Sequence, residues 1–287
     1  MDPIATPSVS VAHIPATNTG QKQPWWHSFA RIFSPNVKLP RTTFHLMVLV
    51  QLLIFVLYWV NVDSPLLPKP LEIWHSFVQL TVRDNLFGEL ATSLTLVSWG
   101  MLYTVIISLL VSYLIVIPFF RPLAFIISKL RFLSLVGLSF FFTMMMQNGH
   151  GLKTSLLVFG MSVFFVTSMV SVILSIPTSE FAHARTLKMK EWEVVWEVII
   201  LGKIDQVFDV IRQNFAISWM MLTMVEKISE AEGGIGALLY NQHKYMHMDA
   251  VFAIQLVILF VGIGADYFFG WLRNFLCPYA TLTLEKR

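Results

Sequence analysis

The sequence carries little charge and almost no cysteine. Only 13% of its 287 residues are charged and 56% are hydrophobic, whereas a soluble domain has about 25% charged residues. The single cysteine, Cys277, has no partner for a disulfide or for a cysteine-rich metal site. These shortages exclude a disordered chain and a disulfide-built scaffold, and they favour lipid as the surrounding medium.

Sequence signatures of catalysis and of nucleic-acid binding are also missing. No G-x-x-x-x-G-K-[S/T] loop occurs, and the nearest string, Gly149–Thr154, has the wrong spacing. We therefore predict that the chain is not an enzyme and holds no cofactor of its own. The net charge is +3, but the basic residues lie in loops between apolar runs and form no continuous face, so we predict no nucleic-acid partner.

The eight histidines are scattered along the chain, which argues against a membrane enzyme with a convergent cluster of His, Asp or Glu. His243 and His247 are four residues apart and share a helix face, but only Asp249 lies nearby as a further ligand. We predict no metal site.

Six apolar runs are present, and a helix needs about 20 apolar residues to cross a bilayer. In chain order they are Phe44–Val62, Thr92–Phe119, Phe132–Met146, Thr154–Ile176, Phe215–Ser229 and Ala250–Leu276. The third and fifth are the shortest. Because the runs are continuously apolar and do not alternate, they predict helices and not a β-barrel. We expect an all-α integral membrane protein with six transmembrane helices.

Basic residues concentrate in three segments: before the first run, after the second and after the fourth. The remaining loops are acidic or nearly neutral, which is the asymmetry that marks cytoplasmic segments. The two ends of the chain then both lie in the cytoplasm, as in a multi-pass protein of the plasma membrane.

Residues 1–43 precede the first run and are expected to form a cytoplasmic tail. Met1–Gly20 is rich in Pro, Thr, Ser and Ala and lacks the apolar core of a cleaved signal peptide. Gln23–Phe33 places aromatic residues at helical spacing beside His27 and Arg31. This pattern predicts an amphipathic helix lying in the membrane interface, with an aromatic-rich linker as the alternative. Residues 44–287 form the transmembrane domain.

The loop between the fourth and fifth runs, about residues 177–214, is the most polar segment after the tail. Thr178 or Ser179 is placed to cap a helix whose first turn holds Glu180. Apolar residues mostly three or four apart then alternate with charged ones, at Leu187, Trp192, Val195, Trp196 and Ile199. Such a helix either rests on lipid headgroups or docks another protein.

Several spacings in and after this loop follow one order. Ala182-His183-Ala184-Arg185-Thr186-Leu187-Lys188 is followed by Trp192, then by Arg212, Trp219 and Glu226 at steps of seven. Gly234-x-Gly236, Asp249, and Gly262 with Asp266 continue the series, and Leu67–Pro70 precedes it. The series resembles the EAA signature and flanking motifs of ABC importer permeases, more narrowly the nitrate, sulfonate, taurine and bicarbonate class. It covers about Leu66 to Phe275.

The sequence departs from this signature at named positions. Ala182 stands where the family has glutamate, Lys188 where it has glycine, and Leu201 and Asp205 where it has prolines. Without Gly and Pro, the stretch from Glu180 to Ile200 is expected to tolerate one longer helix. Either the docking surface is rebuilt for a particular ATPase, or the chain works beside a more regular permease.

The resemblance implies a type I ABC importer permease fold, one helix plus a five-helix core, in the inner membrane of a bacterium. The implied partners are cytoplasmic ATP-binding subunits that hold ATP-Mg, a second permease copy or a paralogue, an external solute-binding protein, and membrane lipid. The implied ATPase-coupling residues are Ala184, Arg185, Thr186, Leu187, Lys188 and Trp192. A small anionic substrate is implied by the resemblance alone.

Ionisable residues inside apolar runs are costly and usually paired or functional. Glu226 either reaches water at the outer end beside Lys227 or lines the pathway, and Asp266 is expected to hold the last helix by a hydrogen bond. Met144 and Met145 either line an adaptable gate or face lipid. The candidate pathway residues are Met144, Met145, Trp219, Glu226 and Asp266. The alternative function is an ATP-independent secondary transporter or channel, but neither inverted halves nor chains of intramembrane charge are evident.

Overall fold

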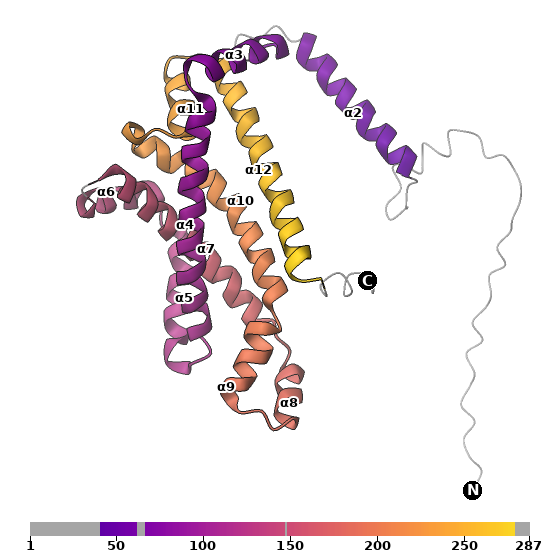
Figure 1. Ribbon diagram of the computed structural model, residues 1–287, viewed down its shortest axis with the longest axis vertical. Coiled ribbons are helices and arrows are strands. Elements are labelled where there is room, and N and C mark those ends of the chain that lie inside the picture. Colours follow the sequence, from indigo (N-terminus) through magenta and orange to yellow (C-terminus); the bar gives the residue numbers. More distant parts are fainter. Residues whose placement is uncertain (1–40, 62–66, 147, 279–287) are drawn as a thin grey trace, which may run out of the picture. The chain divides into compact units, whose positions relative to one another are not determined.

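The computed structural model describes residues 41–61, 67–146 and 148–278, shown in colour in Figure 1. The chain divides into two compact units, Met1–Asn61 and Val62–Arg287. The predicted interfacial helix, Gln23–Phe33, lies outside the described residues, as does most of the predicted tail.

The described part of the first unit is one helix, α2 (Arg41–Asn61). Its 21 residues extend over about 32 Å at 1.5 Å per residue, enough to cross the hydrocarbon core of a bilayer. The helix coincides with the first predicted run, Phe44–Val62, to within three residues at its start and one at its end.

The second unit consists of the helices α3 (Pro70–Arg83), α4 (Leu86–Leu114), α5 (Arg121–Lys129), α6 (Leu135–Met145), α7 (Gly149–Leu174), α8 (Thr178–Thr186), α9 (Glu191–Val194), α10 (Ile204–Ile228), α11 (Ile235–Lys244) and α12 (Met248–Leu276). Four further helical segments lie between them: η1 (Pro118–Phe120), η2 (Leu130–Phe132), the π-helix η3 (Val195–Leu201) and η4 (Glu230–Glu232). Pro70 begins α3, where its missing N–H costs no hydrogen bond.

Helix α7 forms the core of this unit and packs against α4, α5, α6 and α10. The side chains of Leu156, Met161 and Phe165 on α7 are fully buried. On α4, Ser93, Thr104 and Ser108 are fully buried too. Small side chains of this kind allow two helix backbones to approach closely, as is common between helices in lipid.

Four described helices are long and apolar enough to cross a membrane: α2, α4, α7 and α12. The third predicted run, Phe132–Met146, is not a straight span. Its helix α6 has 11 residues, and the chain bends by 108° between the segments Pro118–Phe132 and Leu135–Met145. Counting that bent pair as one span gives five. The predicted count of six is not confirmed.

Helix α10, which contains the fifth predicted run, Phe215–Ser229, is not among the four apolar helices. It is 25 residues long but carries five charged side chains, at Asp205, Asp209, Arg212, Glu226 and Lys227. The run seen in the sequence is only the apolar middle and end of this longer helix, because α10 begins eleven residues earlier, at Ile204.

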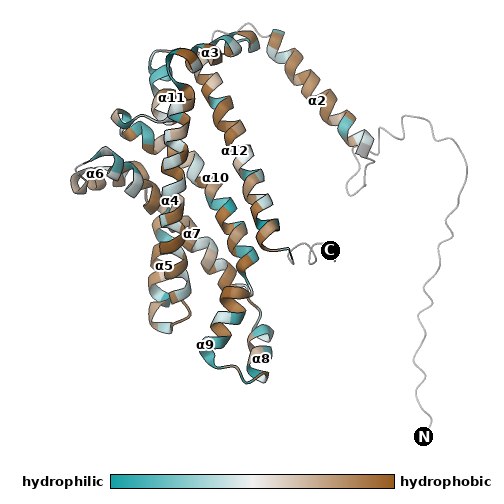
Figure 2. Ribbon diagram, viewed as in Figure 1, coloured by the Kyte–Doolittle hydropathy of each residue, from teal (hydrophilic) through white to brown (hydrophobic). Residues whose placement is uncertain are grey.

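The distribution of polarity follows the fold (Figure 2). Helices α4 and α12 are predominantly hydrophobic, whereas α8 and α9 carry much of the polar colour at one end of the second unit. Large apolar side chains such as Trp99, Phe140 and Phe260 are exposed on α4, α6 and α12. With lipid as the medium these side chains are covered, and the described helices are those of a multi-pass membrane protein.

Candidate functional site

The polar loop, residues 177–203, forms two short helical arms. One is α8, and the other is α9 continued by η3. The loop is shorter than the predicted range 177–214, because Ile204 to Asn214 already belong to α10. In Figure 1 the two arms lie at one end of the second unit, and α3 and α11 lie at the other.

Helix α8 begins without a side-chain cap. Thr178 is its first residue and Pro177 occupies the capping position, with no side-chain hydrogen bond. The predicted caps, Thr178 and Ser179, are therefore wrong. Pro177 has an extended backbone (φ −68°, ψ 143°), and the fixed φ of a proline ring suits the entry into a helix turn.

The two arms are separated by a tight turn at Leu187–Lys190, so the single helix expected from Glu180 to Ile200 is wrong. Lys188 has φ 59°, a left-handed conformation that ends a helix and that glycine adopts most readily. Its N–H donates to the carbonyl of Arg185 at 2.9 Å. The turn therefore survives the replacement of the family's glycine by lysine.

Side chains close the turn from both sides. The Arg185 guanidinium donates to both carboxylate oxygens of Glu191, at 3.2 and 3.1 Å. The N–H of Lys190 donates to the Glu193 carboxylate at 2.8 Å and so satisfies the first turn of α9. These bonds offset the preference of a helix to continue through Lys188.

The base of the loop is held by a further ion pair. Lys203, just before α10, lies 3.2 Å from the carboxylate of Glu180 in α8, and the Lys203 side chain is only 15% exposed. Ala184 and Ile199 are buried inside the loop. A cavity of about 410 Å³ opens between α8 and η3 and is lined by residues that include His183, Leu187 and Glu197.

The outward surface of the loop combines apolar and charged side chains. Leu187 is 61% exposed, Trp192 71% and Trp196 56%. Arg185, Thr186 and Lys188 are exposed beside them. Of the six predicted coupling residues, only Ala184 is buried. Large exposed aromatic side chains rimmed by charge are typical of a protein-docking or membrane-contact surface.

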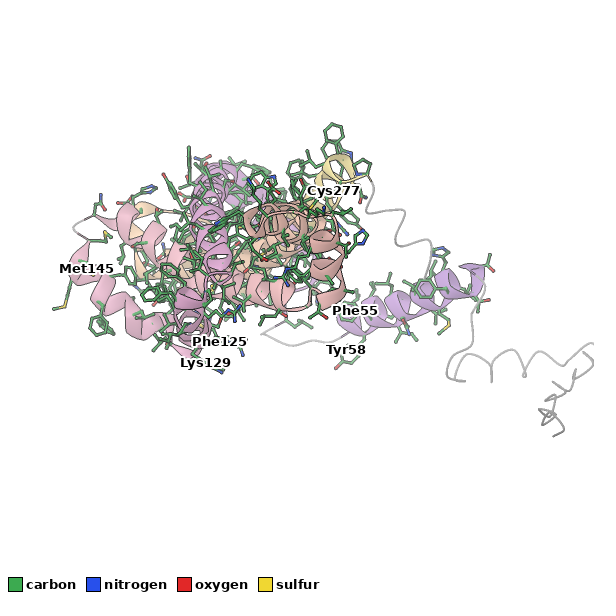
Figure 3. The ribbon with its side chains drawn as sticks, turned by 90° about the horizontal axis from the view of Figure 1, so that it is seen from below. Phe55, Tyr58, Phe125, Lys129, Met145 and Cys277 are labelled. Atoms are coloured by element: carbon green, nitrogen blue, oxygen red, sulfur yellow. The ribbon has the colours of Figure 1, made fainter. Side chains whose placement is uncertain are left out.

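The predicted pathway residues do not form one cluster. Met144 and Met145, at the end of α6, are 88% and 75% exposed, and Met145 points away from the neighbouring helices in Figure 3. Trp219 is buried, and its Nε1 donates to the carbonyl of Ile258 at 2.9 Å. Trp219 therefore ties α10 to α12.

Glu226 is fully buried at the end of α10. Its carboxylate accepts hydrogen bonds from Ser93 Oγ at 2.5 Å and from the N–H of Gly236 at 2.7 Å. Lys227 does not pair with it and instead lies over the ring of Tyr240, 4.4 Å from its centroid. Of the two roles expected for Glu226, the outer pair with Lys227 is wrong, and its burial leaves no free side chain to line a pathway in this conformation.

A short turn after η4 packs onto the Glu226 carboxylate. Gly233 and Gly234 have φ 69° and 105°, values that side-chain-bearing residues rarely adopt. The N–H of Gly234 donates to Glu89, and Lys153 Nζ donates to the carbonyl of Gly233 at 2.7 Å. Lys153 is buried on α7, and its place directly before the fourth predicted run, Thr154–Ile176, was the only signal for it in the sequence.

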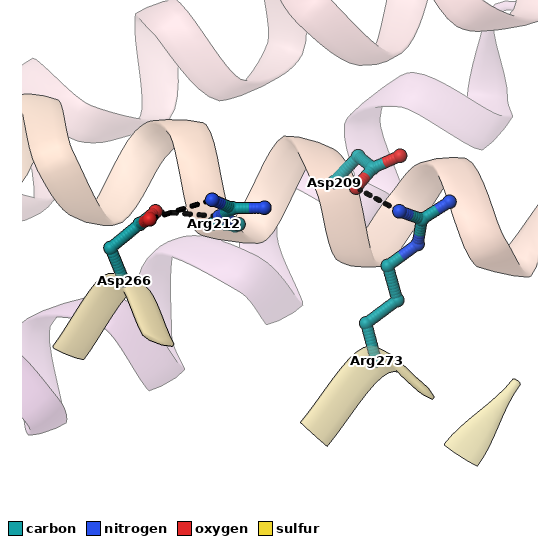
Figure 4. A network of polar contacts seen from close by, with 4 residues as sticks. All are labelled: Asp209, Arg212, Asp266 and Arg273. Atoms are coloured by element: carbon teal, nitrogen blue, oxygen red, sulfur yellow. Dashed lines mark hydrogen bonds and ion pairs between the residues drawn. The ribbon is translucent and has the colours of Figure 1, made fainter. Parts of the chain in front are cut away.

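Two ion pairs join α10 to α12 (Figure 4). Arg212 donates to both oxygens of Asp266, at 2.5 and 2.6 Å, and Arg273 lies 3.1 Å from Asp209. Asp209 precedes Arg212 in α10, but its partner Arg273 follows Asp266 in α12. The helices α10 and α12 therefore run antiparallel. Asp266 thus holds the last helix, as expected, through a charged partner. Sequence reasoning missed the Asp209–Arg273 pair, although opposite charges were visible three residues apart in α10 and seven residues apart in α12.

The histidine pair is not part of a metal cluster. His247 shares a hydrogen bond with Gln242 at 2.9 Å, and Asp249 accepts one from Ser76. Over the described ranges there is no group of three His, Cys, Asp or Glu side chains able to hold a metal ion.

Two comparisons identify similar proteins. A protein of Methanocaldococcus jannaschii described as an ABC transporter permease is 23% identical over 120 residues, 41% of this chain and 45% of that protein. The bicarbonate transport system permease protein CmpB of Synechococcus elongatus is 22% identical over 121 residues, 40% of this chain and 44% of the relative. The chain thus spans less than half the length of the curated relatives it matches. No family model matches it.

A solved structure shares the fold. A chain from the crystal structure of an amino acid ABC transporter with histidines superposes with a TM-score of 0.57 at 16% identity, covering 70% of this chain and 96% of that one. The family resemblance read from the sequence is confirmed: the relatives of this chain are ABC transporter permeases, and its fold is shared with a chain of an ABC transporter.

Proposed function

We propose that this chain is the transmembrane subunit of an ATP-driven importer and that the polar loop couples it to a separate ATPase. The observation that carries the proposal is the outward surface of that loop, where Arg185, Leu187 and Trp192 are exposed together on two arms fixed by internal ion pairs. A rigid loop with exposed aromatic anchors can transmit the movement of a bound protein to the membrane helices better than a flexible linker can.

The finer assignments follow from the same proposal. ATP and Mg²⁺ bind to the partner, α10 serves as a span beside the bent α5–α6 pair, and the loop and both ends of the chain lie in the cytoplasm. A second permease copy or paralogue completes the pathway, and an external binding protein delivers the solute. The half-exposed charges of Arg212 and Asp266 support this assembly, because charges within a membrane normally face protein or water.

The substrate class we propose to test first is a small anion. The support is the name of one similar permease, which transports bicarbonate. Uptake of labelled bicarbonate, nitrate and a small sulfonate by cells that express the chain with its neighbouring genes tests this assignment. Equal uptake with and without the chain for all three would reject a small anion.

Coupling is tested by purification under mild detergent. The chain should retain an ATPase subunit, and Leu187→Asp should release it because a buried carboxylate disrupts an apolar docking contact. Leu71→Asp is the matched control, since Leu71 is 72% exposed and lies on α3, outside the loop. Absence of any ATPase from the wild-type preparation would instead favour an ATP-independent transporter or channel.

A further inference from the structure

A concave pocket lies between α5 with η2 on one side and the end of α7 on the other. Its volume is about 450 Å³. It is distinct from the cavity of the polar loop and contains none of the predicted coupling or pathway residues. The pocket lies toward the end of α7 that leads into α8. Figure 3 shows two of its lining residues, Phe125 and Lys129, close together at one edge of the second unit.

The lining of this pocket has positive charge and no negative charge. Lys129 and Arg131 are its two cations, and no carboxylate is among the lining residues. Both side chains are exposed. Within the described residues neither cation has an acidic partner, and Arg131 only lies over the ring of Phe132, at 5.0 Å. Two unpaired cations at one pocket form a site for an anion.

The remaining polar groups leave one free donor. The other hydroxyl groups of the lining donate to backbone carbonyls of their own helices. Ser171, exposed on α7, makes no such hydrogen bond among the contacts of the described chain. Its O–H can therefore donate to an anion held by Lys129 and Arg131.

The floor of the pocket is apolar. Phe125 and Leu174 are 52% and 64% exposed, and the buried side chain of Val170 also lines the pocket. A soluble anion gains no favourable contact with these apolar side chains. A phospholipid, by contrast, can place its phosphate on the cations and an acyl chain along the apolar side chains. Basic pockets between membrane helices on the cytoplasmic side commonly bind anionic headgroups in this way.

The neighbouring cavity provides an internal comparison. It has a volume of about 570 Å³ and also contains basic side chains, but there Arg185 is paired with Glu191. Its charge is therefore partly balanced from within the chain. The lining of that cavity contains two arginines, Arg121 and Arg185, and one carboxylate, whereas the lining of the pocket with Lys129 and Arg131 contains no carboxylate.

We infer that this pocket binds the phosphate headgroup of an anionic phospholipid, with Lys129, Arg131 and Ser171 on the phosphate and an acyl chain on Phe125 and Leu174. The bound lipid would bridge α5 to the end of α7, the helix that continues into the polar loop. The inference does not depend on the coupling proposed above, since it concerns different residues and a different ligand.

Native mass spectrometry of the full chain in mild detergent, with added phosphatidylglycerol or phosphatidylcholine, tests this inference. We expect phosphatidylglycerol to be retained preferentially, and K129Q/R131Q to weaken its retention by about tenfold or more, because each cation near an anionic headgroup contributes roughly fivefold. The double variant K188Q/K190Q removes the same charge from the polar loop and should leave lipid retention unchanged. Equal retention of both lipids, or equal loss in both double variants, would overturn a specific site.

A second variant separates the pocket from simple surface charge. Ser171→Trp fills the pocket while keeping both cations, and therefore also the charges that orient the chain in the membrane. We expect it to weaken phosphatidylglycerol retention to a similar extent, and undiminished retention would overturn the pocket. Displacement of the lipid by millimolar inorganic phosphate would show that a free anion is the ligand and would overturn the lipid assignment.

Discussion

Four charged side chains of α10 and α12 are matched in two pairs. Arg212 meets Asp266, and Asp209 meets Arg273, on two antiparallel helices. Isolated charges are expensive in a bilayer, and pairing is the usual way in which they are accommodated. The Arg212–Asp266 pair therefore matters for assembly of α10 with α12 whether or not it also meets a solute.

The charge pairing predicts the outcome of a swap. Asp266→Asn leaves Arg212 with an uncompensated charge, so we expect a smaller yield of monodisperse protein in detergent. The double variant R212D/D266R restores opposite charges and should recover part of that yield. Gel filtration of matched preparations measures it. If the double variant gave as low a yield of monodisperse protein as the single variant, the arrangement of the two side chains, and not the charge balance, would be what assembly requires.

Glu226 has a different role at the other end of α10. Its carboxylate is enclosed and accepts hydrogen bonds from Ser93 and Gly236. Glu226→Ala leaves these buried donors unpaired, which we expect to cost about 2–5 kcal/mol. Thermal unfolding in detergent should show a clear fall in midpoint.

The nearby Glu230→Ala provides the control for this change, since Glu230 is exposed in η4. It removes a carboxylate from the same region without uncovering buried donors. Equal destabilisation by the two variants would contradict a specific role for the buried carboxylate.

At the scale of elements, the polar loop depends on one residue with unusual backbone geometry. Lys188 has φ 59°, a conformation that costs a side-chain-bearing residue about 1–2 kcal/mol. Lys188→Gly should therefore raise stability by about 1 kcal/mol. Lys190 has an ordinary extended backbone (φ −68°), so Lys190→Gly should lower stability by up to about 1 kcal/mol. Thermal midpoints that move in the same direction for both variants would argue against strain at Lys188.

Variants of the Arg185–Glu191 ion pair distinguish a structural role of Arg185 in the loop from a direct role in docking the ATPase. Arg185 and Glu191 are 60% and 75% exposed, and such surface pairs contribute only about 0–1 kcal/mol. We expect Arg185→Glu to abolish ATPase capture. The double variant R185E/E191R should also capture no ATPase, because the partner contacts an arginine at position 185 and not at position 191. Full recovery in the double variant would mean that Arg185 acts only by shaping the loop.

At the scale of the whole molecule, the proposed orientation places the α8–α9 end inside and the α11 end outside. Replacing Cys277 by serine gives a background without cysteine. In that background, Trp192→Cys should react with an impermeant maleimide only in inverted vesicles, and Lys244→Cys only in intact cells. Labelling of both positions from the same side would reject the orientation.

The long apolar helices were predictable because membrane insertion depends on local composition. The runs at α2, α4, α7 and α12 stand out in any window of about 20 residues. The bent α5–α6 pair and the length of α10 were not predictable in the same way. A bend leaves the apolar residues in place, and two charges of α10, Asp209 and Arg212, are paired with residues of α12 that lie more than 50 positions away.

The candidate sites divide in a similar manner. The position of the polar loop and the spacing from Arg185 to Asp266 were evident from residue order, and they led to the family. The pairing of Lys153 with the Gly233 carbonyl, by contrast, depends on residues 80 positions apart. The turn at Lys188 was missed because helix propensity at that position favours continuation, while Glu191 and Glu193 stabilise the break.

Composition and the order of apolar and basic segments were thus sufficient to indicate a membrane protein, because partition into lipid depends on each segment almost separately. The resemblance to a permease family came from the motif spacing between Arg185 and Asp266. Tertiary contacts decided which charges are buried, which are paired and which are left open. Glu226 is enclosed because Ser93 and Gly236 meet it. Among the described residues, Lys129 and Arg131 remain unpaired because the fold brings no carboxylate into their pocket.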